Sequence, residues 1–453
     1  MRLTEQLCAA APPGQRHLDD AAVRRLQELT GTLIAERAEE AAAELRRFLD
    51  VRERAICLPH DELSGALGGA VVLVTGGTGC VGSALIGQLA AYCPARVMSV
   101  SRGGAYPWPR YGHAVYRAAD IRDAAFRQLV RELSPDVIFH VAGQRDPGLA
   151  EVQVHRTVTT NVSGTHNVLQ AAEQAGARVV LAGTGKALRP FSADIYTASK
   201  RAAEHLVAGA QVPASVVRFT HVADNSIIYQ RLRAWAAGGG PVRLHRPDVS
   251  FYVQSALEAA QLLLLASLDR RCVRVIHDLG WPVSLLDMAL GVLAATGSAA
   301  PLYISGYDRG YEEVPFPGLY DPRTAGDVSP LLNAFEAAAA VPSACPMTDV
   351  CPAAAGRGVQ PAFQSLHALC AGTDDPGKVR GGLRELSWAL LDDTLAAVPV
   401  PVLERVCGLV ARVPDLPADH DAIFQCMKRA LYARQFLALL ARERTGPIYR
   451  ACP

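Results

Sequence analysis

The chain has 453 residues, enough for about two or three domains with a large buried core. Its net charge of +1 gives no electrostatic footprint for nucleic acid or for an anionic membrane surface. With 50% hydrophobic and 20% charged residues, the composition is that of a soluble globular enzyme.

Cysteine usage and apolar runs exclude further classes. The 11 cysteines have no CxxC spacing, and nothing beside the closest pair, Cys345 and Cys351, completes a zinc site. We therefore expect reduced thiols and no metal. The N-terminus lacks the apolar stretch of a secretory signal, and the longest apolar run, at 262–266, is too short to span a bilayer. These features predict a cytoplasmic protein with neither a nucleic-acid nor a membrane partner.

The first 68 residues are expected to form an N-terminal helical extension. Residues 1–14 end in Ala-Pro-Pro-Gly and resemble a frayed terminus. Residues 18–51 repeat apolar side chains at helical spacing, with charged residues on the other face. We predict two amphipathic helices here, which pack on the main domain or on a partner subunit.

A glycine-rich turn follows four apolar β-formers at 71–74 and precedes an apolar helical pattern. In dinucleotide-binding turns, the glycines corresponding to Gly76, Gly79 and Gly82 allow the tight turn, the approach of a pyrophosphate and close helix packing. The free N–H groups of the first helical turn then face the phosphates. An ordinary turn is the alternative, but the flanking strand and helix favour a nucleotide cofactor.

Strands continue to alternate with helices after this turn. The further expected strands are 95–100, 113–118, 136–141 and 178–182. This alternation predicts an α/β fold with a doubly wound, parallel sheet of the Rossmann type. We expect this core at 69–325, with a small substrate lobe mainly in 222–325.

The end of the second strand indicates which cofactor binds. Ser101 and Arg102 provide a hydroxyl and a guanidinium where an NAD enzyme usually has a carboxylate for the ribose hydroxyls. We therefore predict NADP ahead of NAD; the alternative is that Arg102 is simply solvated. The predicted cofactor contacts are Thr75, Gly76, Gly79, Cys80, Val81, Gly82, Ser101, Arg102, Asp120, Ile121, Val141, Ala142, Gly143, Asn161, Tyr196 and Lys200.

Tyr196 and Lys200 are the candidate redox pair, because residues four apart share one face of a helix. A phenol has a pKa of about 10, and a nearby ammonium favours the phenolate and lowers that pKa. The pair can then exchange a hydroxyl proton while hydride moves to or from nicotinamide. Thr184, at the end of the preceding strand, can bind the same substrate oxygen. This spacing also occurs by chance on surface helices.

Lysine is rare in this chain, since only four of the 45 basic residues are lysines. Two of them, Lys186 and Lys200, nevertheless fall within one window of 15 residues. A lysine amine can give up its proton at working pH, whereas arginine cannot. The placement therefore favours a chemical role, with chance as the alternative.

These residues resemble the extended short-chain dehydrogenase/reductase superfamily, and more closely its UDP-N-acetylglucosamine 4,6-dehydratase, or polysaccharide-biosynthesis, branch. The similar segments are 75–82, 120–123, 140–147, 160–165, 184–200, 218–222 and 277–289, within about residues 60–325. The resemblance implies oxidation of a sugar nucleotide at C4, loss of water across C5 and C6, and return of the hydride. It implies that Tyr196 and Lys200 serve the oxidation and that Lys186 removes the C5 proton.

Some positions depart from that family. Gly185 stands where the family has an aspartate that helps expel the C6 hydroxyl. The segment 184–196 is two residues longer than usual, and we predict that its Asp194 supplies the missing acid. His221 replaces an asparagine, and the diphosphate-binding segment survives weakly around 308–310. The predicted substrate contacts are His221, Asn225, Arg246 and Arg309.

The rest of the chain carries no recognisable chemistry. Residues 326–361, with their Pro, Ala and Cys residues, are expected to form a linker. Residues 362–453 contain three apolar helical patterns and should form a C-terminal helical region. Such a region suits assembly into a homo-oligomer or coverage of the active site.

Three functions stay open. The first is NADP-dependent modification of a sugar nucleotide, as a 4,6-dehydratase or an epimerase, with the hydride returned. The second, which the absent carboxylate at Gly185 favours, is an NADP(H)-dependent oxidoreductase or epimerase of a non-nucleotide hydroxylated metabolite. The third is a cofactor-binding scaffold without turnover, which the intact Thr184, Tyr196 and Lys200 set argues against. Net NADPH turnover separates the first two.

Overall fold

A computed structural model describes residues 3–104, 107–269, 273–276, 279, 282–312, 316–320, 331–337, 341–342, 347–350, 357–413, 416 and 418–444. A sheet of nine strands runs through its centre in the order β14-β15-β11-β6-β5-β4-β1-β2-β3. These strands are β1 (Val71–Thr75), β2 (Arg96–Ser101), β3 (Ala114–Ala118), β4 (Val137–His140), β5 (Arg178–Ala182), β6 (Ala214–Val217), β11 (Val273–Ile276), β14 (Val341–Pro342) and β15 (Met347–Val350).

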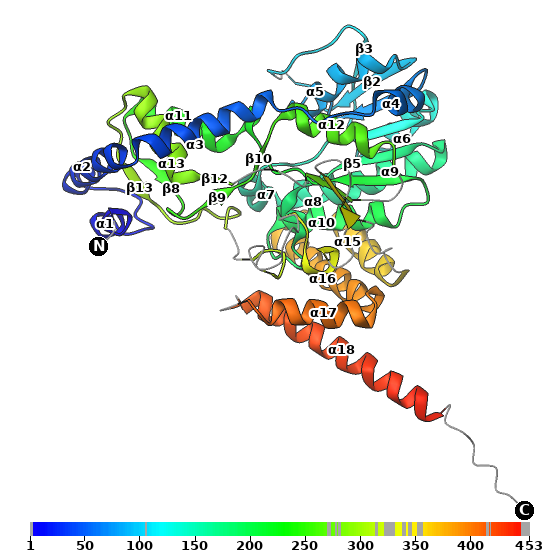
Figure 1. Ribbon diagram of the computed structural model, residues 1–453. Helices are drawn as coiled ribbons and strands as arrows, with labels where there is room; N and C mark the ends of the chain where they lie inside the picture. Colours follow the sequence, from blue (N-terminus) through cyan, green and yellow to red (C-terminus); the bar gives the residue numbers. More distant parts are fainter. Residues whose placement is uncertain are drawn as a thin grey trace, which may run out of the picture.

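The seven strands from β11 to β3 are parallel, which confirms the predicted doubly wound Rossmann architecture (Figure 1). The four strands expected after the glycine turn lie within one residue of β2, β3, β4 and β5. The chain leaves β1 for β2 on one side and later returns to β4 on the other side. The carboxyl ends of β1 and β4 therefore border the crevice where such sheets bind ligands.

Helices cover both faces of the sheet, so its inner strands are continuous apolar runs. Helices α5 (Cys80–Leu89) and α12 (Ala256–Ala266) pack together on one face. Helices α6 (Ala124–Leu133), α9 (Gly164–Ala175) and α10 (Ile195–Ala208) pack side by side on the other. In α6, for example, Phe126, Val130 and Leu133 recur at helical spacing and are buried against the core.

A second lobe follows β6. Its elements are β7 (His221–Val222), η5 (Ala223–Asn225), α11 (Ile227–Gly238), β8 (Val242–Leu244), β9 (Ser250–Phe251), β10 (Val253–Gln254), β12 (Val283–Ser284), α13 (Leu285–Thr296) and β13 (Leu302–Ile304). The N-terminal helices α1 (Leu3–Ala10), α2 (Asp20–Glu36), α3 (Ala38–Asp50) and η1 (Val51–Glu53) share one apolar core with this lobe. Helix α4 (His60–Leu67) packs on the main core instead.

Helices α2 and α3 match the two predicted amphipathic helices, and they pack on helix α13 of the second lobe. Helix α3 crosses α13 closely because Gly291 has no side chain; a Cβ there would lie 2.4 Å from the carbonyl oxygen of Ala41. The guanidinium of Arg37 also forms a paired hydrogen bond with Asp287, at 2.6 and 2.9 Å. The terminus expected to be frayed contains α1, whose Leu7 is fully buried.

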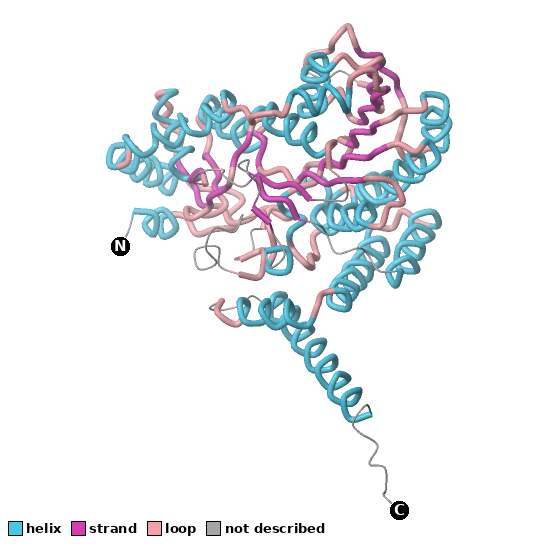
Figure 2. Tube along the Cα trace, turned by 45° about the vertical axis from the view of Figure 1, so that its right-hand side comes forward, coloured by secondary structure: helices cyan, strands magenta, loops and turns pink. Residues whose placement is uncertain are grey.

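The C-terminal region is helical, as predicted. It comprises α15 (Gln360–Gly372), α16 (Pro376–Ala397), α17 (Val400–Val410) and α18 (Ala418–Arg444), whereas α14 (Ala334–Ala337) and η6 (Arg357–Val359) fall in the range expected to be a linker. Helix α16 packs on α10 and on α8 (Val154–Val158), whereas α18 extends away from the body (Figures 1 and 2). The range expected to be a linker also contributes β14 and β15, and β15 pairs antiparallel with β11.

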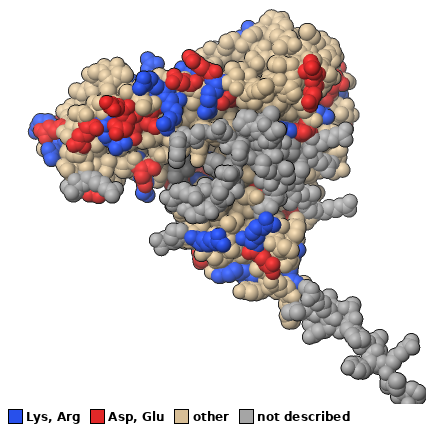
Figure 3. Space-filling view, in the orientation of Figure 1, with Lys and Arg blue, Asp and Glu red and all other residues tan. Residues whose placement is uncertain are grey.

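Acidic and basic side chains are interspersed on the face seen in Figure 3, in keeping with the small net charge. Among the helices of the described ranges, none has the length and apolarity needed to cross a bilayer. Several residues singled out in the sequence lie outside the described residues. They are Cys345, Cys351, His277, Asp278, Gly280 and Trp281.

Candidate active site

A cavity of about 1250 Å³ lies at the carboxyl ends of the parallel strands, between the sheet and the second lobe. The predicted site residues that line it are Gly76, Gly79, Cys80, Val81, Gly82, Ser101, Arg102, Asp120, Ile121, Val141, Ala142, Gly143, Thr184, Lys186, Tyr196, Lys200, His221, Asn225 and Arg246. Thr75, Asn161, Asp194 and Arg309 are not among the lining residues. The cavity therefore brings most of the predicted cofactor, catalytic and substrate residues together.

The glycine turn forms one end of this cavity. Gly76 has a left-handed φ of +74°, and a Cβ on it would lie 2.7 Å from the amide nitrogen of Ala142. A Cβ on Gly82 would lie 2.4 Å from the carbonyl oxygen of Gly76. Helix α5 begins after Gly79, which has no side chain to cap the first-turn N–H groups. This cradle fits the pyrophosphate of a dinucleotide.

Cys80, at the start of α5, places a thiol, a possible nucleophile, in this turn. Burial raises the pKa of its thiol to about 12. The thiol therefore stays protonated at neutral pH and is a poor nucleophile.

The end of the cavity that is predicted to hold the adenosine combines polar and aromatic groups. Arg122 donates to both carboxylate oxygens of Asp120, at 3.0 and 2.7 Å, and together with the nearby Arg102 it holds the pKa of that carboxyl below its usual value. Ser101 and Arg102 line the cavity beside them. Trp108, half-buried, lines the same cavity and was missed; an aromatic residue soon after the second strand was the available signal.

The redox residues come from consecutive elements. Strand β5 ends at Ala182, and Thr184 then caps the short helix η4 (Gly185–Leu188). Tyr196 lies in the first turn of α10, and Thr184 is close enough to its phenol to act on the pKa of Tyr196. Lys200, one turn further on, donates from Nζ to the carbonyl oxygen of Ala182 at 2.7 Å. Thr184, Tyr196 and Lys200 are all buried, so the group is held in place by its surroundings.

The pKa of the Tyr196 phenol is raised, whereas the sequence predicted that it is lowered. Burial raises the pKa of Tyr196, and this outweighs the opposing effect of its hydrogen bond to Thr184. The predicted partner, Lys200, directs its amine to the Ala182 carbonyl instead. Burial lowers the pKa of Lys200 itself to about 8. Arg145, which follows the predicted Ala142-Gly143 pair and was missed, lines the cavity and acts to lower the pKa of Tyr196.

Thr75 and Asn161 support the site from behind the cavity. The ring of His140, fully buried at the end of β4, is hydrogen-bonded to Thr75 Oγ1 at 2.7 Å and to Thr165 Oγ1 at 3.0 Å. Burial lowers the pKa of His140 to about 3, so the ring is neutral. Asn161 accepts from the amide of Gln144 at 2.8 Å and donates to Ser199 at 3.0 Å. Both predicted cofactor contacts thus fix the strand-end backbone instead of lining the cavity.

Asp194 also has a different role from the predicted one. One oxygen accepts from the amide of Thr197 at 2.7 Å, which makes Asp194 the N-cap of α10. The other oxygen accepts from the Ser192 hydroxyl and from Arg189. Asp194 therefore starts α10, and the geometry gives no support for it as the missing acid.

Arg309 differs in the same way. Its Nε lies 3.2 Å from the Glu151 carboxylate, and its side chain is 70% exposed. The same carboxylate accepts from the amide of Ile195 and pairs with Arg380 of α16. Arg309 thus joins the lobe to the start of α10 and to the C-terminal region, away from the cavity lining.

Gly185, where the carboxylate is absent, is packed against a leucine. A Cβ on Gly185 would lie 2.7 Å from Cδ2 of Leu331. Leu331 lines the cavity together with Pro317, Gly318, Tyr320 and Leu332. No sequence signal indicated these residues, which come from the range beyond the recognised motifs.

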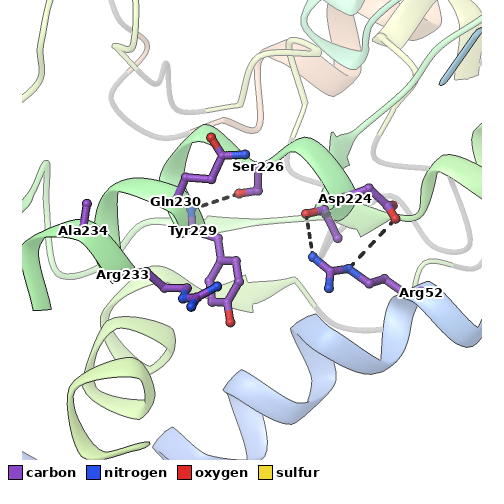
Figure 4. A pocket seen from close by; sticks show the side chains of 8 residues that line it. Arg52, Asp224, Ser226, Tyr229, Gln230, Arg233 and Ala234 are labelled. Carbon is purple, nitrogen blue, oxygen red and sulfur yellow. Dashed lines mark hydrogen bonds and ion pairs between the residues drawn. The ribbon is translucent and has the colours of Figure 1, made fainter. Parts of the chain in front are cut away.

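On the lobe side, His221 is held by its neighbours. Its Nε2 lies 2.5 Å from the hydroxyl of Ser226, the N-cap of α11, and burial lowers the His221 pKa to about 4. Ser226 and Gln230 also line a smaller cavity of about 460 Å³, where Arg52 of η1 lies 4.0 Å from Asp224 (Figure 4).

Within the described residues there is no cluster of three or more His, Cys, Asp or Glu suited to a metal.

The fold, the glycine turn and the cavity define a Rossmann-type protein with its ligand site at the strand ends. A family model described as polysaccharide biosynthesis protein matches residues 72–310, more than half of the chain, and the chain belongs to this family. This confirms the resemblance to the polysaccharide-biosynthesis branch of the extended short-chain dehydrogenase/reductases. The match ends before the residues that pack against Gly185.

Two curated relatives are each similar over a part of the chain. The probable polysaccharide biosynthesis protein EpsC of Bacillus subtilis is 28% identical over 284 residues, 57% of this chain and 47% of that protein. The capsular polysaccharide biosynthesis protein CapD of Staphylococcus aureus is 24% identical over 254 residues, 52% of this chain and 42% of that protein. The chain thus spans less than half the length of these relatives.

Among solved structures, Pen from Bacillus thuringiensis has a similar fold, with a TM-score of 0.52 at 20% identity. The similarity covers 63% of this chain and 87% of that one.

Proposed function

We propose that this protein is an NADP-dependent enzyme that transiently oxidises a sugar nucleotide, isomerises it and returns the hydride, as an epimerase. The observation that carries the proposal is the burial of Thr184, Tyr196 and Lys200 together in the lining of the cavity bounded by the glycine turn. A scaffold without turnover has no need of such an arrangement.

When bound, the nicotinamide supplies the hydride acceptor. In its ionised form, Tyr196 Oη takes the proton of the reacting hydroxyl, and Thr184 orients that oxygen. Because burial raises the pKa of Tyr196, this form becomes more populated as the pH rises. Lys200 places an amine beside the strand end, and its pKa of about 8 lets its charge vary near neutral pH. The buried setting excludes water from the proton transfer.

Lys186, which lines the same cavity two residues after Thr184, is proposed as the base for the carbon next to the ketone. In its neutral form its amine can accept the proton that the ketone has made acidic. Reprotonation from the opposite face, followed by return of the hydride, gives an isomer of unchanged mass. Gly185 and Leu331 provide no acid for a leaving hydroxyl, so epimerisation is favoured over dehydration.

We propose that Ser101 and Arg102 bind the 2′-phosphate of NADP, since they line the cavity beside Asp120, whose carboxylate is already bonded to Arg122. His221, Asn225 and Arg246 are the proposed contacts of the sugar nucleotide on the lobe side.

A second candidate is an epimerase or oxidoreductase of a non-nucleotide hydroxylated metabolite. The pairing of Arg309 with Glu151 favours it, because this guanidinium is the remnant of the diphosphate-binding segment.

The test is incubation of the purified protein with NADP and a panel of UDP-sugars in D₂O, followed by chromatography and mass spectrometry. Epimerisation predicts altered retention, one deuterium taken up from solvent and no net NADPH. Loss of water would instead show dehydration, and net NADPH would show an oxidoreductase. Tyr196→Phe should lose all conversion, whereas Tyr432→Phe, on the exposed face of α18, is the matched control. If NADP binds but every sugar returns unchanged, the non-nucleotide candidate takes its place.

A further inference from the structure

Part of the cavity is formed by the chain beyond the family match. We call residues 316–320 and 331–337 the wall segment. Five of them, Pro317, Gly318, Tyr320, Leu331 and Leu332, line the cavity. Tyr320, Leu331 and Leu332 have exposed fractions of only 2, 6 and 1%, so the wall segment is an integral part of the buried site.

A buried ionic network fixes the wall segment to the catalytic helix. Arg218, with 0% of its side chain exposed, donates to the carbonyl oxygen of Leu331 at 3.0 Å and to Glu336 at 2.6 and 2.8 Å. The same guanidinium donates to Glu204 of α10 at 2.7 Å. Asn333 donates to the carbonyl oxygen of Leu188, at the end of η4, at 2.9 Å. The position of Leu331 is therefore set from both α10 and η4.

The two halves of the wall segment are also joined directly. The amide of Ala334 donates to the carbonyl oxygen of Gly318 at 2.8 Å. A Cβ on Gly318 would lie 2.7 Å from the carbonyl oxygen of Leu332, so these backbones are in close contact. Such fixed, close packing can discriminate between substrates by shape.

The wall segment faces the residue next to the redox group. Thr184, which lines the cavity with Tyr196, is followed directly by Gly185, and the Leu331 methyl fills the space beside that glycine. The carbonyl oxygen of Phe219, 3.5 Å from a Cβ on Gly185, already accepts from the amide of Gly185 at 2.7 Å. A substrate hydroxyl placed here would lose its hydrogen bonds to water and would contact the Leu331 methyl group instead, which is unfavourable.

From this geometry we infer that Leu331 is a specificity-determining residue which selects a 6-deoxy sugar nucleotide. The inference rests on the proposed function, in which a hexose is oxidised at C4. The exocyclic C6 is the flexible substituent two bonds from the reacting carbon, and the leucine methyl accommodates CH₃ better than CH₂OH. A methyl group at this position also has no leaving group, so the enolate formed when Lys186 removes the proton cannot eliminate water and can only be reprotonated.

The experiment compares UDP-glucose, UDP-6-deoxyglucose and UDP-3-deoxyglucose as probes, with kcat/KM and Kd measured in the presence of NADP. The wild type should favour the 6-deoxy sugar over UDP-glucose by about tenfold to a hundredfold, the range by which an apolar pocket rejects an added hydroxyl. Leu331→Ala should bring this ratio close to one while the Kd for NADP stays unchanged. Leu403→Ala, an equal truncation at a fully buried position of α17, is the matched control and should leave the ratio unchanged.

The outcomes separate this inference from the proposed function. A wild-type preference for UDP-glucose, a ratio that Leu331→Ala does not move, or an effect confined to the 3-deoxy sugar would overturn the role of Leu331 and leave sugar-nucleotide turnover standing. If no sugar nucleotide binds to either protein while NADP does, the proposed function fails and the inference with it. Melting curves of both variants identify any loss of ratio that comes from misfolding.

Discussion

Glu336→Gln tests how strongly the buried ionic network holds the wall segment. The carboxylate of Glu336 binds two nitrogens of Arg218 and lies 3.6 Å from Arg201. Arg218 and Arg201 keep the attraction of Glu204 after the change, but Arg201 loses the carboxylate that lies 3.6 Å from it. Removing one partner of a buried pair typically costs about 3 to 5 kcal/mol. Because glutamine retains one acceptor oxygen, we expect a loss of about 3 kcal/mol in the free energy of unfolding at pH 7.

The effect should depend on pH in a defined direction. The neighbouring arginines hold the pKa of Glu336 below its usual 4.5, against the opposing effect of burial. An acid with a depressed folded-state pKa stabilises the fold above its unfolded pKa, and the contribution is lost as pH falls through the folded pKa. The stability difference between wild type and Glu336→Gln should therefore be complete at pH 7 and shrink as the pH falls below 4.5.

Urea unfolding followed by circular dichroism, at several pH values, measures this difference. The control is Glu28→Gln, which removes a carboxylate from the exposed pair with Arg25, with side chains 67 and 55% exposed. An exposed pair contributes about 0 to 1 kcal/mol. If Glu336→Gln costs no more than this control, or if its effect does not change with pH, the network does not hold the wall segment as argued.

Arg102→Ala should weaken NADP binding by about tenfold or more and NAD binding little, as measured by calorimetry, because a charge-assisted hydrogen bond contributes about 1.5 to 3 kcal/mol; equal losses for both cofactors would contradict the 2′-phosphate assignment. Asp194→Ala should lower stability by about 1 kcal/mol through loss of the helix cap, whereas Asp194→Asn should keep turnover, and loss of turnover in the latter would restore Asp194 as the acid. Burial lowers the pKa of Lys200 from 10.5 to about 8, so the unfolded chain holds this proton to higher pH than the folded chain does. The stability of the wild type relative to Lys200→Met should therefore rise as the pH increases from 8 towards 10, and a flat difference would refute the burial argument.

The sequence was sufficient for the features that depend on local patterns. Three such patterns involve only residues that are close in sequence. They are the continuous apolar run of β1, the glycines that follow it, and the four-residue spacing of Tyr196 and Lys200. Strand positions and the glycine turn were predicted for that reason. The turn also needs Gly76 in a left-handed conformation, which few other residues adopt.

The parts that the sequence did not predict depend on distant contacts. Arg218 and Glu336 are 118 residues apart, and no local spacing connects them. The direction of the Tyr196 pKa shift depends on how much of the phenol is buried, which the motif does not state. Asp194 was interpreted as a reactive acid, although an aspartate just before an apolar helical pattern is equally typical of a helix cap.

The close crossing of α3 and α13 at Gly291 affects where this protein can be divided. The family-matched range 72–310 includes α13 but omits α3, so a shortened chain of that range would leave the apolar face beside Gly291 open to water. It would also deprive the buried Arg218 of Glu336 and of the Leu331 carbonyl. The unit that folds is therefore larger than the range that the family model matches, because residues on both sides of that range form part of its interior.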